Sequence, residues 1–491
     1  MLYKTSFHKI IGAIALIFLV ACTSPTPVPS DRPQAAIPLE ACQISTPNGN
    51  IRLEAKCGKL VVYEDRQTNT GRQIELNIAV IPAVSRNPTP DPIFFIPGGP
   101  GEAATQSFPV LMGAFEQINQ KRDIVLVDQR GTGGSHSLRC QAEDSGQNGQ
   151  TDTAEYLKSC LAALDANPRL YTTSIAMDDL EQVRQALGYE KINLYGASYG
   201  TRAALVYLRQ YPNSVRTIIL DGVAPTNWSI GPSVASDGQR ALDLIFSRCA
   251  ASSDCLAAFP DLKDEFQSVI NDLQDQSIEV TLDHPITGET TTFQLTLDDF
   301  ASTIHTMSYA PETAALIPLM VSNAFSHQDF RPLAAQFLST TETLGTSISG
   351  GMRFSIICAE DVPFYNETTM TEGYLGDYIV ESFREICRTW PQGQIPAGYK
   401  EPVSSNIPVL LISGEADPVT PPNNAEMAAK TLPNSLQLVI PDMGHVNIFR
   451  GCVPKLATAF IESGSIQGLD TGCVEKTIPM PFFLNLSGPH P

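Results

Sequence analysis

The sequence is short of basic residues and contains no basic run. Its 491 residues include 32 lysines and arginines but 52 aspartates and glutamates, so the formal charge is −20 at pH 7. Nucleic acids and anionic lipid surfaces are bound by clustered lysine and arginine. The charge balance therefore argues against nucleic acid, or a lipid surface recognised by charge, as a partner.

The sequence also lacks internal repeats and the cysteine and histidine spacings that are typical of metal sites. The sequence has no C-x-x-C pair and no cluster of cysteine and histidine, which structural metal sites require. We therefore expect no metal, and no pattern calls for another cofactor. No stretch after the N-terminus is long and apolar enough to span a bilayer.

The N-terminus has the pattern of an export signal. Two lysines precede an apolar run over residues 10–21, which is too short to cross a membrane but suits the core of a signal peptide. The run ends in Leu19-Val20-Ala21-Cys22, which resembles the bacterial lipobox and predicts that Cys22 is lipidated. A plain secretory signal cut near Ala21 is the alternative.

This pattern predicts a protein of the cell envelope that contacts a membrane only through its lipid anchor. The expected organisation is a signal peptide at 1–21, an anchor cysteine and Pro-rich linker at 22–42, the first part of a core at 43–228, a helical cap at 229–402, the second part of the core at 403–476, and a tail at 477–491.

Ten cysteines follow Cys22, and an even number in an exported chain favours disulfides. They fall into pairs that are close in sequence, although spacing alone does not prove connectivity. The expected pairs are Cys42–Cys57, Cys140–Cys160, Cys249–Cys255, Cys358–Cys387 and Cys452–Cys473.

The hydrophobic pattern predicts strands that alternate with helices. Continuous apolar runs indicate buried strands, and alternation around a polar turn indicates a hairpin at a sheet edge. The expected strands are 59–64 and 74–81 (the hairpin), 92–96, 123–128, 192–194, 215–221, 407–413 and 435–440. Core helices are expected near 171–187, 203–208 and 453–463. This alternation predicts an α/β fold with a doubly wound, mostly parallel sheet.

Between the two groups of strands, the pattern becomes helical. Helical spacing appears at 239–249, 262–273, 313–325 and 374–387, and one possible hairpin lies at 277–295. Because no strand–helix–strand alternation appears there, we expect an inserted, largely helical cap.

The residues Gly196-Ala197-Ser198-Tyr199-Gly200 form a G-x-S-x-G motif between an apolar run and a helical pattern. This is the context of a nucleophile elbow, in which a sharp turn exposes the serine. Chance would produce the pentapeptide in roughly one chain in six of this length, so partners are needed. Asp417 and His445 each follow a late strand.

The order Ser198, Asp417, His445 is that of the triad in α/β-hydrolases. A serine hydroxyl is a weak nucleophile, so an imidazole must take its proton and a carboxylate must orient the imidazole. Glu415 and Asp442 are the rivals of Asp417.

Five motifs, in order along the chain, resemble the proline iminopeptidase family and its secreted tripeptidyl aminopeptidase-like branch. They are Pro97-Gly-Gly-Pro-Gly101, Asp128-Gln-Arg-Gly-Thr-Gly-Gly-Ser135, Gly196-Ala-Ser-Tyr-Gly200, Asp417-Pro-Val-Thr-Pro421 and Gly444-His445. Pro97 stands where proline iminopeptidases have histidine, and this departure matches the tripeptidyl branch.

The resemblance implies an α/β-hydrolase fold and a serine exopeptidase that acts on peptides with a free N-terminus. In the family's pattern, the backbone N–H groups of Gly99 and Tyr199 form the oxyanion hole, with Gly98 as a weaker alternative to Gly99. A tight structural turn is the other interpretation of the glycine loop.

An aminopeptidase also needs a carboxylate for the substrate ammonium group. The segment around Cys358 resembles the family's Cys-x-x-Asp region, so Glu360 and Asp361 are candidates, with Glu102 as a third. They could instead be solvated loop acids. Arg130 is expected to be structural and to pair with a core carboxylate.

Two rival functions remain at this stage. An extracellular carboxylesterase would use the same triad, whereas a binding module would not react through Ser198. A dehalogenase is disfavoured because such enzymes carry aspartate at the elbow.

Overall fold

The structure is a computed structural model that describes residues 37–140, 153–366, 373–485 and 487–488. Cys22 and the expected signal peptide lie outside the described residues. None of the helices within these ranges is long and apolar enough to cross a membrane.

Nine strands in the described ranges form one sheet, in the order β1-β2-β3-β5-β4-β6-β7-β10-β11. Their bounds are β1 Glu40–Ser45, β2 Arg52–Asp65, β3 Thr70–Ile81, β4 Ile93–Ile96, β5 Ile124–Val127, β6 Ile192–Ala197, β7 Val215–Asp221, β10 Val409–Gly414 and β11 Ser435–Ile440. Within this sheet, neighbouring strands in the order β5-β4-β6-β7-β10-β11 pair in parallel. Strands β1, β2 and β3 pair antiparallel and add an edge beside β5. The expected mostly parallel sheet is confirmed.

One strand was not predicted from the sequence pattern. β1 starts at Glu40, inside the range 22–42 expected to be linker, and pairs with β2 from Glu40↔Cys57 to Ser45↔Arg52. Its alternation of exposed and buried side chains is short and weak because it is the edge strand.

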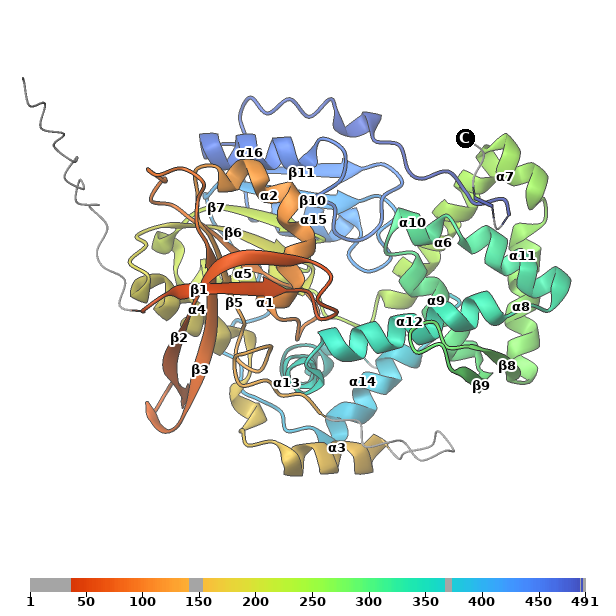
Figure 1. The fold of residues 1–491 in the computed structure, drawn as a ribbon, viewed down its shortest axis with the longest axis horizontal. Helices are drawn as coiled ribbons and strands as arrows, with labels where there is room; N and C mark the ends of the chain where they lie inside the picture. The colour runs from red at the N-terminus through yellow and green to blue at the C-terminus, as the bar shows by residue number, and fades with distance from the viewer. Residues whose placement is uncertain (1–36, 141–152, 367–372, 486, 489–491) are drawn as a thin grey trace, which may run out of the picture. The chain divides into compact units, whose positions relative to one another are not determined.

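Helices cover both faces of the sheet (Figure 1). Their bounds in the core are α1 Ala104–Ser107, α2 Met112–Asn119, α3 Thr153–Ala163, α4 Thr173–Ala186, α5 Tyr199–Gln210, α15 Pro422–Ala429 and α16 Val453–Ser463. Residues of α4, α5 and α15 share one buried cluster with the sheet, and residues of α1, α2 and α16 share the other. This two-sided burial explains why the parallel strands read as continuous apolar runs.

A cap region, which we define as residues 234–389, lies between β7 and β10 in the chain. Its elements are α6 Val234–Ala251, α7 Ser253–Ala258, α8 Leu262–Asp275, β8 Ile278–Asp283, β9 Thr290–Leu295, α9 Leu297–Met307, α10 Pro311–Ala314, α11 Ile317–His327, α12 Arg331–Ser347, α13 Gly350–Glu360 and α14 Tyr378–Thr389. The hairpin expected at 277–295 is confirmed as β8 and β9. Most cap helices share a hydrophobic cluster separate from the two clusters of the sheet.

The chain after the last core helix returns to the cap region. Phe482 is buried in the cap cluster, and the Arg248 guanidinium stacks over its ring at 4.4 Å. The N–H of Phe483 donates to the carbonyl of Ala315 at 3.1 Å. The end of the chain thus ties the cap region to the core.

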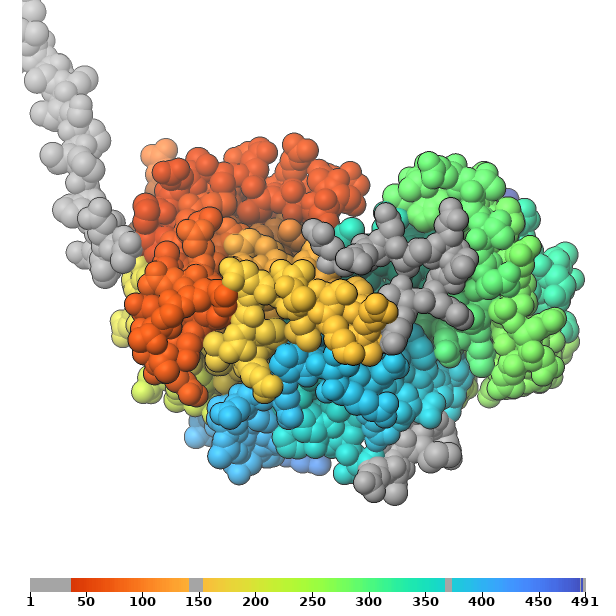
Figure 2. Space-filling model, turned by 90° about the horizontal axis from the view of Figure 1, so that it is seen from below, coloured from red at the N-terminus to blue at the C-terminus, as the bar shows by residue number. Residues whose placement is uncertain are grey.

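Five disulfides join described cysteines, and all match the expected pairs: Cys42–Cys57, Cys140–Cys160, Cys249–Cys255, Cys358–Cys387 and Cys452–Cys473. Figures 1 and 2 show α3 beside α14, where Cys160, Cys358 and Trp390 form a small buried cluster.

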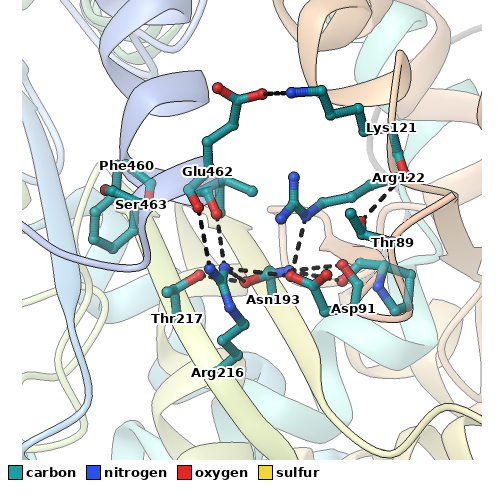
Figure 3. Close-up of polar contacts among 12 residues, drawn as sticks. Thr89, Asp91, Lys121, Arg122, Asn193, Arg216, Thr217, Phe460, Glu462 and Ser463 are labelled. Atoms are coloured by element: carbon teal, nitrogen blue, oxygen red, sulfur yellow. Dashed lines mark hydrogen bonds and ion pairs between the residues drawn. The ribbon is translucent and has the colours of Figure 1, made fainter.

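A polar network closes the amino ends of the parallel strands (Figure 3). Asn193 donates to Asp91 Oδ2 at 3.0 Å and accepts from Arg216 at 3.1 Å and from Thr217 at 2.6 Å. Arg216 also donates to the Ile461 carbonyl at 2.7 Å. The network therefore joins β6, β7 and α16 at the edge of the sheet opposite the carboxyl ends.

Candidate active site

Ser198 lies in a sharp turn between β6 and α5. Its backbone has φ 54° and ψ −124°, a conformation that L-residues rarely adopt. A Cβ at Gly196 would lie 2.4 Å from the carbonyl oxygen of Gly200, and one at Gly200 would lie 2.1 Å from that of Ile96. Both positions therefore require glycine, and the elbow expected from the sequence is present as a backbone structure.

Asp417 follows β10 and is fully buried. It accepts hydrogen bonds from the N–H groups of Val419 at 2.8 Å and Thr420 at 2.9 Å, and from the Thr420 hydroxyl at 2.9 Å. Burial alone would raise its pKa, but the charge and hydrogen bond of His445 and these N–H groups outweigh burial and lower it. Asp417 is therefore held as a carboxylate.

His445 follows β11, and its Nδ1 lies 2.8 Å from Asp417 Oδ2. The Thr420 hydroxyl lies 3.1 Å from the same nitrogen. Burial would lower the pKa of His445, but Asp417 raises it above its ordinary value, with smaller contributions from Asp221 and Glu102. Because Nδ1 faces Asp417, Nε2 is the nitrogen left for proton transfer.

The structure brings the three expected triad residues to one edge of the sheet. They follow β6, β10 and β11, and β7 lies between β6 and β10. At the end of β7, a Cβ on Gly222 would lie 3.0 Å from His445 Cε1. The carboxyl ends of adjacent parallel strands are where ligands bind in open α/β sheets.

The glycine loop after β4 lies directly against the elbow. A Cβ on Gly98 would lie 3.1 Å from Ser198 Cβ, and Gly99 has φ 105°. Tyr199 is the first residue of α5, so its N–H is one of the unpaired donors at a helix start. The two backbone donors expected for an oxyanion thus come from segments that meet beside Ser198.

Glu102 lies beside the same loop. The position of a Cβ on Gly98 is 3.6 Å from Glu102 Oε1, and the Ser107 hydroxyl donates to Oε2 at 3.0 Å. Burial raises its pKa, while Ser107, the charge of His445 and the Gly98 N–H act in the opposite direction. Among the three carboxylates considered for a substrate amine, Glu102 is the one electrostatically coupled to the candidate triad.

Glu360 and Asp361 lie in different surroundings, and neither has exposed surface. Glu360 accepts from Thr173 N–H at 2.7 Å and Thr173 Oγ1 at 2.8 Å, and also from the Tyr399 hydroxyl. Asp361 forms a fully buried ion pair with Arg202 at 2.9 Å and accepts from the Ile230 N–H at 3.0 Å. These are the environments of structural carboxylates without a free face for a ligand.

Arg130 has the structural role expected from the sequence. It is fully buried and donates to Asp179 at 2.7 and 2.9 Å, and to the carbonyl of Glu64 at 2.7 Å. Among the described residues, no group of histidine, cysteine or carboxylates has the arrangement of a metal site.

Sequence analysis missed Asp221, the last residue of β7. Its carboxylate accepts from the N–H groups of Asn447 at 2.9 Å and Ile448 at 2.7 Å, and from the Tyr195 hydroxyl at 3.1 Å. Burial raises its pKa to about 6. Asp221 therefore holds the turn that carries His445, and its place at a strand end was the signal that could have identified it.

The cap region also contacts this turn and the acid loop. The His445 N–H donates to the Tyr309 carbonyl at 2.7 Å, and the two rings meet edge to face at 5.2 Å. Arg240 of α6 donates to the carbonyls of Glu415 at 2.6 Å and Asp417 at 2.7 Å. These cap residues were not expected from the sequence because they lie far from the motifs along the chain.

Comparison with known proteins gives two family matches. The family described as alpha/beta hydrolase fold matches residues 91–247, and the family described as TAP-like protein matches residues 372–473. Together they span the elbow and the segment with Asp417 and His445.

Similar curated proteins carry peptidase names. Serine protease Hip1 of Mycobacterium tuberculosis is 25% identical over 90% of this chain and 92% of its own length. Tripeptidyl aminopeptidase of Streptomyces lividans is 23% identical over 88% of this chain and 86% of its length. Proline iminopeptidase of Neisseria gonorrhoeae is 32% identical over 28% of this chain and 34% of its length. The chain therefore has the α/β-hydrolase fold, with one segment that matches the α/β-hydrolase family, one that matches TAP-like proteins, and similarity to tripeptidyl aminopeptidase and proline iminopeptidase.

Proposed function

We propose that this protein is an exported serine exopeptidase that cleaves peptides near a free N-terminus through Ser198, His445 and Asp417. The observation that carries the proposal is the 2.8 Å contact of His445 Nδ1 with Asp417 Oδ2, at the sheet edge where Ser198 occupies a strained elbow. The peptidase names of the relatives support a peptide substrate.

The proposed reaction begins when Ser198 Oγ attacks the scissile carbonyl carbon while His445 Nε2 takes its proton. His445 then gives that proton to the leaving nitrogen, and the acyl group stays on Ser198. A water molecule attacks the acyl-enzyme, again with His445 as the base, and the acid product leaves. Asp417 remains ionised and stabilises the imidazolium, in keeping with its lowered pKa.

The oxyanion formed in each step would accept hydrogen bonds from the N–H groups of Gly99 and Tyr199. Removing one such donor typically costs ~3–4 kcal/mol of transition-state stabilisation. Gly98 is less suitable because its N–H interacts with Glu102.

For the substrate ammonium group we propose Glu102. Its coupling to His445 and its place next to the glycine loop support this choice, and Glu102 keeps some exposed surface, whereas Glu360 and Asp361 have none. An ammonium bound this close to Ser198 would favour release of a short N-terminal unit.

Export is the remaining part of the proposal. The five disulfides suit an oxidising compartment, and Cys22 is the proposed lipid attachment site. Cys22→Ser should release the protein from the membrane fraction into the soluble fraction. Retention of the variant in the membrane would contradict the anchor.

The test of the activity compares chromogenic amides of Pro, Ala and Ala-Ala-Pro peptides, each with a free and a blocked N-terminus. Blocked substrates should be turned over far more slowly than free ones. Ser198→Ala should abolish turnover and labelling by a fluorophosphonate probe. Equal rates on free and blocked substrates would contradict the exopeptidase.

A pair of variants separates the amine contact from the chemistry. Glu102→Gln should lower kcat/KM for free peptides by on the order of 10- to 100-fold, the usual range for a lost charged hydrogen bond, and should lower ester hydrolysis much less. The matched control is Glu116→Gln on the exposed side of α2. An equal loss on esters and peptides would remove Glu102 from the amine site.

A further inference from the structure

The Arg353 side chain is half-buried and has no carboxylate partner within the described part of the chain. Within the described part of the chain, its side chain makes no hydrogen bond or ion pair, and Nε has neither a partner nor exposed surface. Its Cζ lies over the ring of Phe383, 5.6 Å from the ring centroid. Burial lowers its pKa, and Tyr309 partly opposes this effect.

The arginines with fully buried side chains, Arg130 and Arg202, differ from Arg353 because they have carboxylates at 2.7 and 2.9 Å. Taking a guanidinium out of water costs several kcal/mol unless an anion compensates it. A cation that the fold leaves uncompensated is therefore a place where a ligand anion gains more than it would at the surface.

Arg353 lies on α13, the helix that begins beside the glycine loop of the candidate active site. The residue before α13, Ser349, donates its N–H to the Gly101 carbonyl at 2.9 Å, and Ile348 forms a β-bridge with Glu102. Arg353 follows four residues later, about 6 Å along the helix at 1.5 Å per residue. On its other side is Tyr309, whose ring meets His445 at 5.2 Å.

We propose that Arg353 binds a carboxylate of the peptide substrate. This inference rests on the proposed function and deepens it, because it predicts a preference for acidic substrates in a protein whose own charge is strongly negative. The carboxylate has two possible sources, the C-terminus of a short peptide or an acidic side chain. A planar guanidinium suits either, since it can donate two parallel hydrogen bonds.

The experiment measures kcat and KM for the wild type and Arg353→Met with two substrate pairs. Trialanine and its C-terminal amide test the terminal carboxylate. Two amidated peptides that differ only in Glu or Gln at the third residue test the side chain. The wild type should favour the acid of one pair by on the order of tenfold or more through KM, and in Arg353→Met the ratio should fall to near one. The pair that responds identifies the source.

A second arm does not depend on peptide cleavage. Trialanine should inhibit hydrolysis of 4-nitrophenyl butyrate by the wild type more strongly than trialaninamide does, and the difference should vanish in Arg353→Met. If the wild type cleaves esters but no free peptide, the proposed function fails. The inhibition experiment still shows in that case whether Arg353 binds a carboxylate. If neither arm shows a preference for a carboxylate, Arg353 has no anion site.

A structural role predicts a different result. Because this half-buried guanidinium has no carboxylate partner, its removal should leave the Tm of Arg353→Met unchanged or higher. A packing residue would instead lower the Tm on removal and reduce turnover of acids and amides alike. Arg384→Gln on neighbouring α14, where the arginine pairs with Glu381, is the control and should keep the wild-type ratio. A lower Tm with equal losses on every substrate would overturn the proposal.

Discussion

His445 interacts electrostatically with three carboxylates, and each holds a different part of the candidate site. Asp417 contacts its ring, Asp221 binds the turn that carries it, and Glu102 lies beside the glycine loop. All three raise the pKa of His445 against the effect of burial. Since a general base must be neutral to accept a proton, activity should fall as the pH drops through this raised pKa.

The first prediction concerns Asp221. Asp221→Asn removes a negative charge that raises the pKa of His445, so the acid limb of kcat/KM should move to lower pH by on the order of half a unit. A pH–rate profile measures the shift, and an ester substrate without an ammonium group keeps the proposed contact of Glu102 with the substrate amine out of the measurement. Asp243→Asn, a half-exposed acid on α6, should leave the limb in place. A shift to higher pH would contradict the stated role.

At this scale, sequence reasoning works for residues tied to a motif and fails for residues defined by distant partners. Ser198, Asp417 and His445 each follow an apolar run, and the structure has a strand at each run. Glu360 was a candidate for binding the substrate ammonium group because its hydrogen-bond partners could not be recognised in the sequence. Thr173 and Tyr399 lie 187 and 39 residues away from it. The structural role of Arg130 could be predicted because a buried arginine needs a carboxylate partner, and the prediction did not require knowing which one.

Among the elements, the elbow has tight steric limits. β4, β6 and α5 meet where Gly200 faces the carbonyl oxygen of Ile96. A strand, turn and helix of this kind follow from local residue types, so the sequence predicted them. β1 and α12 were missed because their apolar patterns are weak, with only Leu333 and Ala334 buried in α12.

The second prediction compares two glycines. Gly200→Ala would place a Cβ 2.1 Å from backbone that cannot move freely, so it should abolish activity and lower the Tm or prevent folding. Gly113→Ala in α2 meets nothing within 4 Å, and it should raise stability by about 0.5–1 kcal/mol. Thermal unfolding and ester turnover measure both. A stable, active Gly200→Ala would contradict the elbow geometry.

In the whole molecule, the polar network that joins β6, β7 and α16 and the candidate active site lie at opposite ends of the strands of one sheet. The candidate site occupies the carboxyl ends of the strands, and the network of Asn193, Asp91 and Arg216 closes the amino ends (Figure 3). The alternation of strands and helices predicted this sheet. The contacts of the cap region with the site could not be predicted, because they join segments distant in sequence, such as Arg240 and Asp417.

The third prediction separates these two edges. Asn193→Leu removes the hydrogen bonds that Asn193 makes with Asp91, Arg216 and Thr217, and loss of a buried hydrogen-bond partner typically costs about 1–3 kcal/mol of unfolding free energy. The Tm should fall, while kcat on an ester at 25 °C should stay within about twofold, a difference of ~0.4 kcal/mol. A large loss of kcat with an unchanged Tm would show that the network reaches the site.

The contacts of Tyr309 and Arg240 with the loops of the candidate site have a consequence for substrate entry. Because the His445 N–H is held by the Tyr309 carbonyl and the Asp417 loop by Arg240, a cap region that swings away would also release the base and its acid. The open state would then be inactive, and hydrolysis would occur only in the closed state. Such coupling would keep a protease harmless to folded proteins too large for the cap region to close over.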